Sequence, residues 1–214
     1  MKLYSYFRSS AAFRVRAALN LKNLDYQIIP VHLLRNGGEQ LTDEYRRINP
    51  AGQVPTLIDN GIKLTQSLAI IEYLDEVHPQ PPLLPADPVD RVHVRSLALA
   101  VACDIHPLNN LRVMRHLKHA LHVDDAGRDA WYRHWCIQGL QVMENMLAQD
   151  KRTGTFCYGE TPTMADCCLV PQIANARRYQ CDLSDMPTIS RINDACLALD
   201  AFQKAAYENQ PDSE

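Results

Sequence analysis

The features that place a protein in a membrane or on nucleic acid are missing from this sequence of 214 residues. No apolar run approaches the roughly 20 residues that span a bilayer, and the beginning of the chain lacks the apolar core of a signal peptide. The formal net charge is -3 and no basic block is present, which gives no support to binding of nucleic acid or an anionic membrane. We therefore expect neither a membrane nor a nucleic acid as a partner.

Cysteine occurs seven times, but no pair has the CxxC spacing of zinc and redox motifs. The odd number favours reduced, mostly buried thiols over a disulfide framework. Adjacent Cys167 and Cys168 are typical of two small apolar residues on a helix. His116, His119 and His122 recur every three residues, but no carboxylate partner stands at the spacing of a zinc site. The sequence thus predicts no metal cofactor and a cytoplasmic location.

The first part of the chain, residues 1–80, alternates between short apolar segments and amphipathic ones. Asn60-Gly61 between two apolar runs is a strong hairpin signal. The predicted order is βαβ, helix, ββ, helix, which indicates a small mixed sheet with helices packed on it. The predicted elements are strand 3–6, a helix from 11 to about 22, strand 26–31, helix 40–48, strands 54–58 and 62–64, and helix 66–77.

Five prolines crowd between residues 79 and 88, and neither a helix nor a central strand continues through proline at that density. We predict a linker over 81–89 between a domain of residues 1–80 and an all-helical domain of residues 90–214. The predicted fold class is therefore α/β plus all-α. The predicted helices of the second domain are 90–118 with a break near Pro107, 124–148, 163–179 and 187–199.

Arg8-Ser9-Ser10 separates the first predicted strand from the first helix. A serine just before a helix is a typical N-cap, and a helix start offers unpaired N–H groups and the positive end of the helix dipole. The two hydroxyl groups and the fixed charge of Arg8 suit an anion such as a thiolate. A capped helix beside an incidental arginine is the alternative interpretation.

Two further segments have both a structural and a functional interpretation. A cis bond between Val54 and Pro55 would let the backbone of Val54 pair with an extended peptide, whereas a trans proline at a sheet edge would be structural. Gln66-Ser67 opens the third helix and is either a second anion site or an ordinary N-cap. Thr163-Met164-Ala165-Asp166 has the form of a capping box, which starts the core helix of the second domain.

Together, in their order and spacing, these segments resemble the glutathione transferases, and the resemblance extends from the first strand to about Phe202. Arg8-Ser9-Ser10 followed by Arg14-Val15-Arg16 is similar to the zeta class, the maleylacetoacetate isomerases. The other segments that carry the resemblance are Asn49-Pro50, Gln53-Val54-Pro55-Thr56-Leu57, Gln66 to Leu74, Leu83-Leu84-Pro85, Thr163 to Asp166, Leu169-Val170-Pro171-Gln172 and Asn175-Ala176-Arg177-Arg178.

The resemblance implies a thioredoxin-like domain that binds glutathione as cofactor, a helical domain that completes the substrate pocket, and a homodimer. It implies that Ser9 or Ser10, with Arg8, acts on the thiolate, and that Val54 beside a cis Pro55 pairs with the cysteinyl part of glutathione. The implied glutathione-binding residues are Ser9, Gln53, Val54, Pro55, Gln66, Ser67 and His106.

The implied substrate is a small dicarboxylic diketo acid, and arginine suits it because the planar guanidinium binds both oxygens of a carboxylate. Arg8 lies beside the predicted thiolate, and Arg178 lies where the family has a substrate-side arginine. Arg177 is next to Arg178 on a different helix face, so we expect only one of the two in the pocket. Arg112 is a weaker candidate.

The implied reaction is the isomerisation of maleylacetoacetate or maleylpyruvate in aromatic catabolism. Thiolate addition turns the cis alkene into a rotatable single bond, and elimination restores a trans alkene and regenerates glutathione. The site must lower the thiol pKa from ~8.5 and stabilise an enolate. The zeta class usually has cysteine where this chain has Ala11, which disfavours a protein thiol and weakens maleylacetoacetate relative to maleylpyruvate.

Two other functions remain open from the residues. A transferase that conjugates or dehalogenates small α-halo acids would use the same thiolate and the same arginines. A non-catalytic binding module on the same fold is the other possibility, although the intact Ser9, Ser10, Gln66 and Ser67 argue against it.

Overall fold

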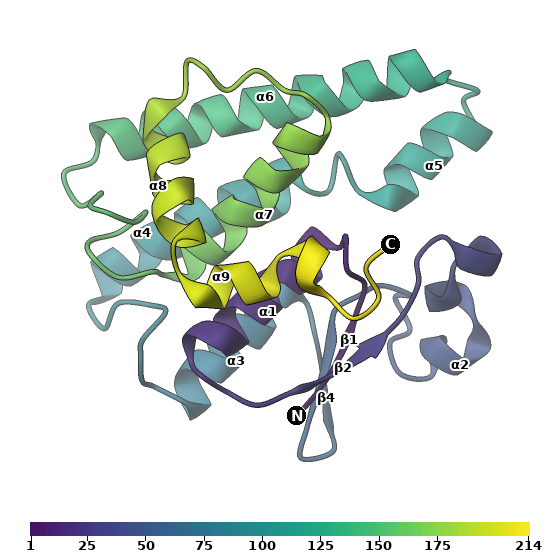
Figure 1. The fold of residues 1–214 in the computed structure, drawn as a ribbon, viewed down its shortest axis with the longest axis horizontal. Coiled ribbons are helices and arrows are strands. Elements are labelled where there is room, and N and C mark those ends of the chain that lie inside the picture. Colours follow the sequence, from purple (N-terminus) through teal and green to yellow (C-terminus); the bar gives the residue numbers. More distant parts are fainter. The chain divides into compact units, whose positions relative to one another are not determined.

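The computed structural model describes residues 1–214, which fold into two compact units (Figure 1). One unit comprises Met1–Leu84 together with Leu197–Glu214, and the other comprises Pro85–Cys196. The predicted α/β plus all-α fold class is confirmed, because all four strands lie in the first unit and the second unit is built from helices.

The sheet of the first unit has the strand order β2-β1-β3-β4. β1 pairs in parallel with β2 and antiparallel with β3, and β3 forms a hairpin with β4. Asn60 and Gly61 both have positive φ, of 46° and 83°, which is the geometry that this two-residue turn requires. The strands are β1 (Lys2–Ser5), β2 (Gln27–Pro30), β3 (Thr56–Asp59) and β4 (Ile62–Thr65).

Helix α1 is the centre of the first unit, since α3 packs on it and so does α9 (Figure 1). It is buried on almost its whole circumference, from Ala12 to Leu19. The predicted helix 40–48 is instead two short turns, because Thr42 is extended and caps the second of them. The helices are α1 (Ser10–Leu21), η1 (Arg35–Gly37), η2 (Glu39–Leu41), α2 (Asp43–Arg46), α3 (Ser67–Val77), α9 (Asp200–Ala205) and η4 (Tyr207–Asn209).

The contacts divide the chain at different residues from the predicted domains 1–80 and 90–214 and the predicted linker 81–89. The carboxylate of Asp75 accepts the N–H groups of Leu83 and Leu84 at 2.7 and 3.2 Å, and both leucines are buried. This attachment keeps the proline-rich segment on the first unit as far as Leu84. The last residues, from 197 onward, also join the first unit because α9 packs on α1.

The second unit is a helical bundle in which α7 packs against α4 and α6. The predicted helix 90–118 is divided, because α4 passes into a π-helical turn that ends before Pro107 and a separate helix follows. No helix combines the length and apolar character needed to cross a bilayer. The helices are α4 (Pro88–Leu99), η3 (Ala100–Ile105), α5 (Leu111–His119), α6 (Asp125–Gln149), α7 (Met164–Arg178) and α8 (Pro187–Leu197).

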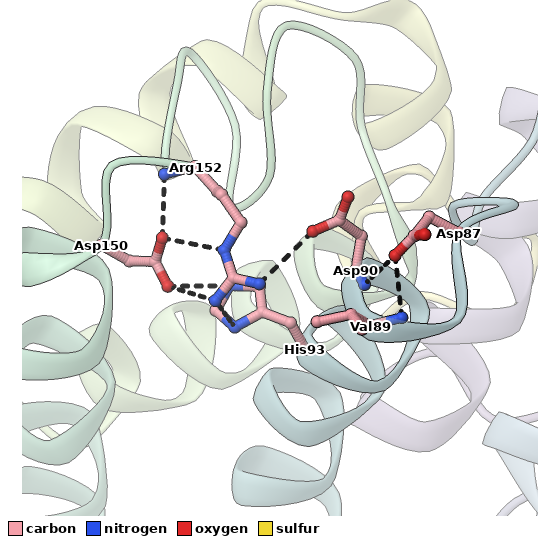
Figure 2. Close-up of polar contacts among 6 residues, drawn as sticks. All are labelled: Asp87, Val89, Asp90, His93, Asp150 and Arg152. Carbon is pink, nitrogen blue, oxygen red and sulfur yellow. Dashed lines mark hydrogen bonds and ion pairs between the residues drawn. The ribbon is translucent and has the colours of Figure 1, made fainter.

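A polar cluster joins α4 to the segment after α6 (Figure 2). Arg152 donates from Nε and Nη2 to the two carboxylate oxygens of Asp150, at 3.0 and 2.6 Å. Its Nη1 lies 3.3 Å from Oδ1 of Asp90 and its Nη2 lies 2.9 Å from Nδ1 of His93. Burial and the charge of Arg152 lower the pKa of His93. Because these charges are paired within the cluster, we assign it a structural role.

Candidate functional site

The turn between β1 and α1 places Ser9 at the N-cap of α1. Its Oγ accepts the N–H of Ala12 at 3.2 Å, and a serine hydroxyl that accepts one bond still has its own hydrogen to donate. The first turn of α1 contains no acidic residue. Ser10 is the first helical residue and is only 7% exposed. The turn therefore has a free hydroxyl donor at the positive end of a helix.

Arg8 adds a positive charge to this turn. Its side chain is exposed, and its Cζ atom lies 4.9 Å from the centre of the Phe7 ring. An arginine held over an aromatic face keeps its N–H edges available for a carboxylate. The geometry of the turn is thus compatible with both the predicted thiolate and a neighbouring substrate carboxylate.

The bond between Val54 and Pro55 is cis, as the resemblance implies. Neither the N–H nor the C=O of Val54 has a hydrogen-bond partner in the chain. The preceding carbonyl, of Gln53, accepts Tyr45 Oη at 2.7 Å and Asn49 Nδ2 at 2.8 Å. The turn is therefore fixed through Gln53, while Val54 presents the backbone pair that an extended peptide requires.

Val54 also lies near the Arg8-Ser9 turn, because it belongs to the same buried cluster as Tyr6 and Phe7. These two residues immediately precede Arg8. The fold therefore brings two of the predicted segments, 8–10 and 53–55, to one region of the first unit.

The start of α3 is a second helix terminus without an acidic residue. Gln66 is exposed and has a φ of 68°, and Ser67 is buried. Nη1 of Arg14 donates to Oγ of Ser67 at 3.2 Å, and Arg14 is only 2% exposed. A buried cation beside a helix N-terminus suits a carboxylate. Sequence reasoning did not select Arg14 as a site residue, although a charged residue inside an otherwise apolar helix was the available signal.

These groups fit glutathione, a peptide that has a thiol and two carboxylates. The free backbone of Val54 suits its peptide part, the start of α3 suits a carboxylate, and the Ser9 hydroxyl suits the thiol. All predicted glutathione-binding residues except His106 belong to the first unit.

The remaining candidates lie in the second unit. His106 follows the π-helical turn η3, is half-buried, and donates its N–H to the carbonyl of Val101 at 3.0 Å. Arg112 is exposed in the first turn of α5.

Arg177 and Arg178 take different directions from the end of α7. Nη2 of Arg177 lies 3.5 Å from Oδ1 of Asp194 on α8. The guanidinium of Arg178 lies 5.3 Å from the centre of the Tyr179 ring, which stacks on Tyr132 at 3.5 Å. Only Arg178 is therefore free of an acidic partner, which favours it over Arg177 for binding a substrate carboxylate.

The chain is similar to known proteins over its full length. The family model of the glutathione S-transferase N-terminal domain matches residues 1–76. A probable maleylacetoacetate isomerase from Vibrio cholerae is 49% identical, over 99% of this chain and 97% of that protein. A holo structure of maleylpyruvate isomerase, a bacterial glutathione S-transferase of the zeta class, has a TM-score of 0.97 and 46% identity and covers 100% of both chains. The structure of a maleylacetoacetate isomerase from Methylobacterium extorquens with bound malonate and glutathione has a TM-score of 0.96 and 40% identity, again with 100% coverage of both chains.

Proposed function

This chain belongs to the zeta class of the glutathione transferases, and on that premise we propose that it is a glutathione-dependent cis–trans isomerase of maleylacetoacetate or maleylpyruvate. Both compounds are diketo acids formed in aromatic catabolism, and both contain a cis double bond. Glutathione is the cofactor and is not consumed. When bound, it supplies the thiolate that adds to the double bond and leaves again after rotation.

The start of α1 is the observation that carries this function. Ser9 caps the helix through its lone pair and keeps its hydroxyl hydrogen for a thiolate. The absence of a carboxylate in this first turn leaves the positive end of the helix dipole available. Ser9 is half-buried whereas Ser10 is 7% exposed inside the helix, so we assign the hydrogen bond to the thiolate to Ser9.

The other binding roles follow from the same geometry. We assign the peptide part of glutathione to the backbone of Val54 beside the cis Pro55, with Gln53 flanking it. We assign its γ-glutamyl end to Gln66 and Ser67, with the buried charge of Arg14 beside Ser67. His106 is a further residue of the glutathione site in this proposal.

Arg8 and Arg178 are proposed to bind the carboxylates of the substrate, and Arg112 is a third candidate. Arg8 lies next to Ser9, so its charge also stabilises negative charge that develops near the thiolate. Arg8, Arg112 and Arg178 are all exposed, and none of them has an acidic partner in the structure. Such side chains can exchange water for a substrate carboxylate without breaking an ion pair.

The cysteines of the chain do not supply the nucleophile in this proposal. All seven lie in the second unit, between Cys103 and Cys196, and the position of the usual zeta-class cysteine is Ala11. Five of the seven are buried, and burial raises the pKa of Cys136 to about 12. Thiols of this kind suit a reducing compartment, and we propose the cytoplasm.

A spectroscopic isomerisation assay tests the function. The chain is given maleylpyruvate or maleylacetone, a stand-in for maleylacetoacetate, with a catalytic amount of glutathione. We expect turnover that requires glutathione, leaves its concentration unchanged, and disappears when S-methylglutathione replaces it. The faster substrate identifies the pathway. Consumption of glutathione with α-halo acids and no turnover of either maleyl compound would contradict the proposal in favour of conjugation.

We also propose that the chain forms a homodimer through α4. The helix exposes Val89, Val92 and Leu99 at 67%, 57% and 40%, and a row of large exposed apolar side chains is typical of an interface. Sedimentation velocity should show a dimer for the unmodified chain and a monomer for Val92→Glu. Val142→Glu, at a residue of α6 that is 52% exposed, is the matched control and should remain dimeric. A monomeric unmodified chain would contradict the proposal.

A further inference from the structure

A buried arginine, Arg16, donates hydrogen bonds to the backbone just before Arg8 and Ser9. Arg16 lies on α1 and is 0% exposed. Its Nη1 donates to Oγ of Ser5 at 2.9 Å and to the carbonyl of Tyr6 at 3.4 Å, and its Nη2 donates to the carbonyl of Phe7 at 3.1 Å. Its Nε donates to the carbonyl of Ala205, at the end of α9, at 2.9 Å.

The charge of Arg16 persists at neutral pH although the side chain is buried. Desolvation lowers its pKa to about 10, and Tyr26 and then the carboxylate of Asp212 oppose that shift. A guanidinium that remains protonated keeps all its N–H donors. Arg16 therefore holds Ser5, at the end of β1, and the next two residues, Tyr6 and Phe7, through charge-assisted hydrogen bonds, which are stronger than neutral ones.

Asp212 holds the same turn from the other end of the chain. Its Oδ2 accepts the N–H of Phe7 at 3.0 Å, across 205 positions of sequence. Phe7 is thus fixed at both of its backbone groups, by Asp212 at the N–H and by Arg16 at the C=O. The carbonyl of Tyr6, which Arg16 also binds, accepts the N–H of Ser9 at 2.9 Å. The hydrogen bonds continue from Asp212 and Arg16 to the backbone of Ser9 itself.

We propose that Arg16 and Asp212 are positioning residues of the isomerase, which orient Arg8 and Ser9 by fixing the backbone of Tyr6 and Phe7. This inference rests on the proposed function. Neither side chain is exposed at the turn, and both act through the main chain. The terminal segment 206–214 is thereby part of the active site's support, although none of its side chains belongs to the predicted site.

Asp212 is the better residue to test. Replacing Arg16 would leave several buried carbonyl groups without donors, so such a variant tests folding as much as positioning. Asp212→Ala removes one hydrogen bond to Phe7 and little apolar packing. Asp212→Asn removes the same charge but keeps an oxygen that accepts the Phe7 N–H. The comparison of these two variants isolates the hydrogen bond from the charge.

The experiment measures the pH titration of the glutathione thiolate by ultraviolet absorbance in the full chain, together with kcat and KM. Relative to Asp212→Asn, we expect Asp212→Ala to raise the midpoint of the thiol titration by about half a pH unit and to lower kcat about fivefold, while KM changes less than about twofold. The exchange of the Phe7 amide hydrogen should accelerate only in Asp212→Ala. Glu208→Ala, an exposed acidic residue of the same segment, should match the unmodified chain.

Identical titrations and identical kcat in the Asp212→Ala and Asp212→Asn variants, with an active unmodified chain, would overturn the positioning role alone. A loss of thermal stability without a change in the titration midpoint would do the same, because a purely structural contact gives that result. Absence of glutathione-dependent isomerisation by the unmodified chain would instead overturn the proposed function, and the positioning role with it.

Discussion

Helices α1 and α7 both have a hydroxyl side chain at the N-cap, yet their first turns differ. At the start of α7, Oδ2 of Asp166 accepts the N–H and the hydroxyl of Thr163, at 2.7 and 2.8 Å. Oδ1 of Asp166 accepts the N–H of Cys157 at 2.8 Å, and the carboxylate is fully buried. At the start of α1, Ser9 accepts the N–H of Ala12 and the first turn has no acidic residue.

The difference separates a structural helix start from a functional one. In α7 the chain's own carboxylate occupies the position that an external anion would take. In α1 and in α3 that position has no acidic side chain, and a serine or a buried arginine stands beside it. A serine or threonine before a helix therefore does not identify an anion site by itself. The absence of an acidic residue in the following turn is the second observation that it needs.

The largest expected effect is a loss of stability when the buried carboxylate of Asp166 is removed from the first turn of α7. Asp166→Ala leaves the N–H groups of Thr163 and Cys157 without their acceptor in a buried place, which should lower the free energy of unfolding by about 3 kcal/mol or more. Urea denaturation measures this change. Asp125→Ala, at an exposed acidic residue in the first turn of α6, is the matched control and should cost less than about 1 kcal/mol. Equal losses in the two variants would show that the buried capping box contributes no more to the stability than an exposed acidic residue does.

The next effect concerns catalysis rather than stability. Ser9→Ala removes the proposed donor to the thiolate and the N-cap, so we expect kcat/KM to fall roughly 30-fold, or about 2 kcal/mol, with about 1 kcal/mol of stability lost from the cap. The pKa of the bound thiol should rise. Ser9→Thr keeps both the acceptor and the hydroxyl and is the control. If Ser10→Ala were more damaging than Ser9→Ala, the assignment of the donor would be wrong.

A carboxylate can also be introduced into the first turn of α1, so that this turn resembles the first turn of α7. Ala11→Asp places a negative charge in a first turn that has none, and Ala11 is half-buried. We expect kcat/KM to fall about fivefold by repulsion of the thiolate, while stability stays level or gains up to about 0.5 kcal/mol from the helix dipole. Kinetics and urea denaturation are measured on Ala11→Asp and on neutral, equally sized Ala11→Asn. A similar loss of activity in both variants would mean that size, and not charge, causes it.

Local signals predicted much of the fold and the core of the site. Asn60-Gly61 identified the hairpin, because few residue pairs adopt positive φ twice. Thr163 and Asp166 identified the capping box, and the serines at positions 9 and 10 identified a helix start, because caps depend on residues three apart. Each of these features is determined by neighbours in sequence, so a pattern over a few residues contains the information.

Contacts between distant residues were not predictable in this way. Arg14 and Arg16 stand among apolar residues of α1, and only the fold shows that their partners are Ser67 and the carbonyls of the turn. The acceptor of the Phe7 N–H is 205 positions away, and no local pattern indicates it. The hydrogen bonds from Leu83 and Leu84 to Asp75 likewise place the end of the first unit after the predicted boundary at residue 80. The density of prolines shows where regular structure stops, but it does not show which side chains bind the backbone there.

The smallest effect concerns the polar cluster of the second unit that joins α4 to the segment after α6. In this cluster His93 faces Arg152, Asp150 and Asp90, and the centre of its ring lies 6.4 Å from that of Tyr158. Burial and Arg152 depress the pKa of His93, so below pH 6.5, its ordinary value, the unfolded chain binds the proton more readily than the folded chain. The contribution of His93 to stability is therefore complete above pH 6.5 and is lost as the pH falls toward the depressed value.

His93→Gln should flatten the dependence of the free energy of unfolding on pH between about 6.5 and 5, the range in which an unperturbed histidine becomes charged, and should change kcat/KM less than about twofold. The hydrogen bonds of Arg152 hold the pKa of Asp150 low, so a second loss of stability, below the ordinary carboxyl value of 3.8, should persist in the variant. Urea denaturation across pH distinguishes the two ranges. An unchanged slope between pH 6.5 and 5 in His93→Gln would mean that another histidine titrates there. A large loss of activity would mean that this paired cluster, unlike the capping box at the start of α7, has a functional role as well as a structural one.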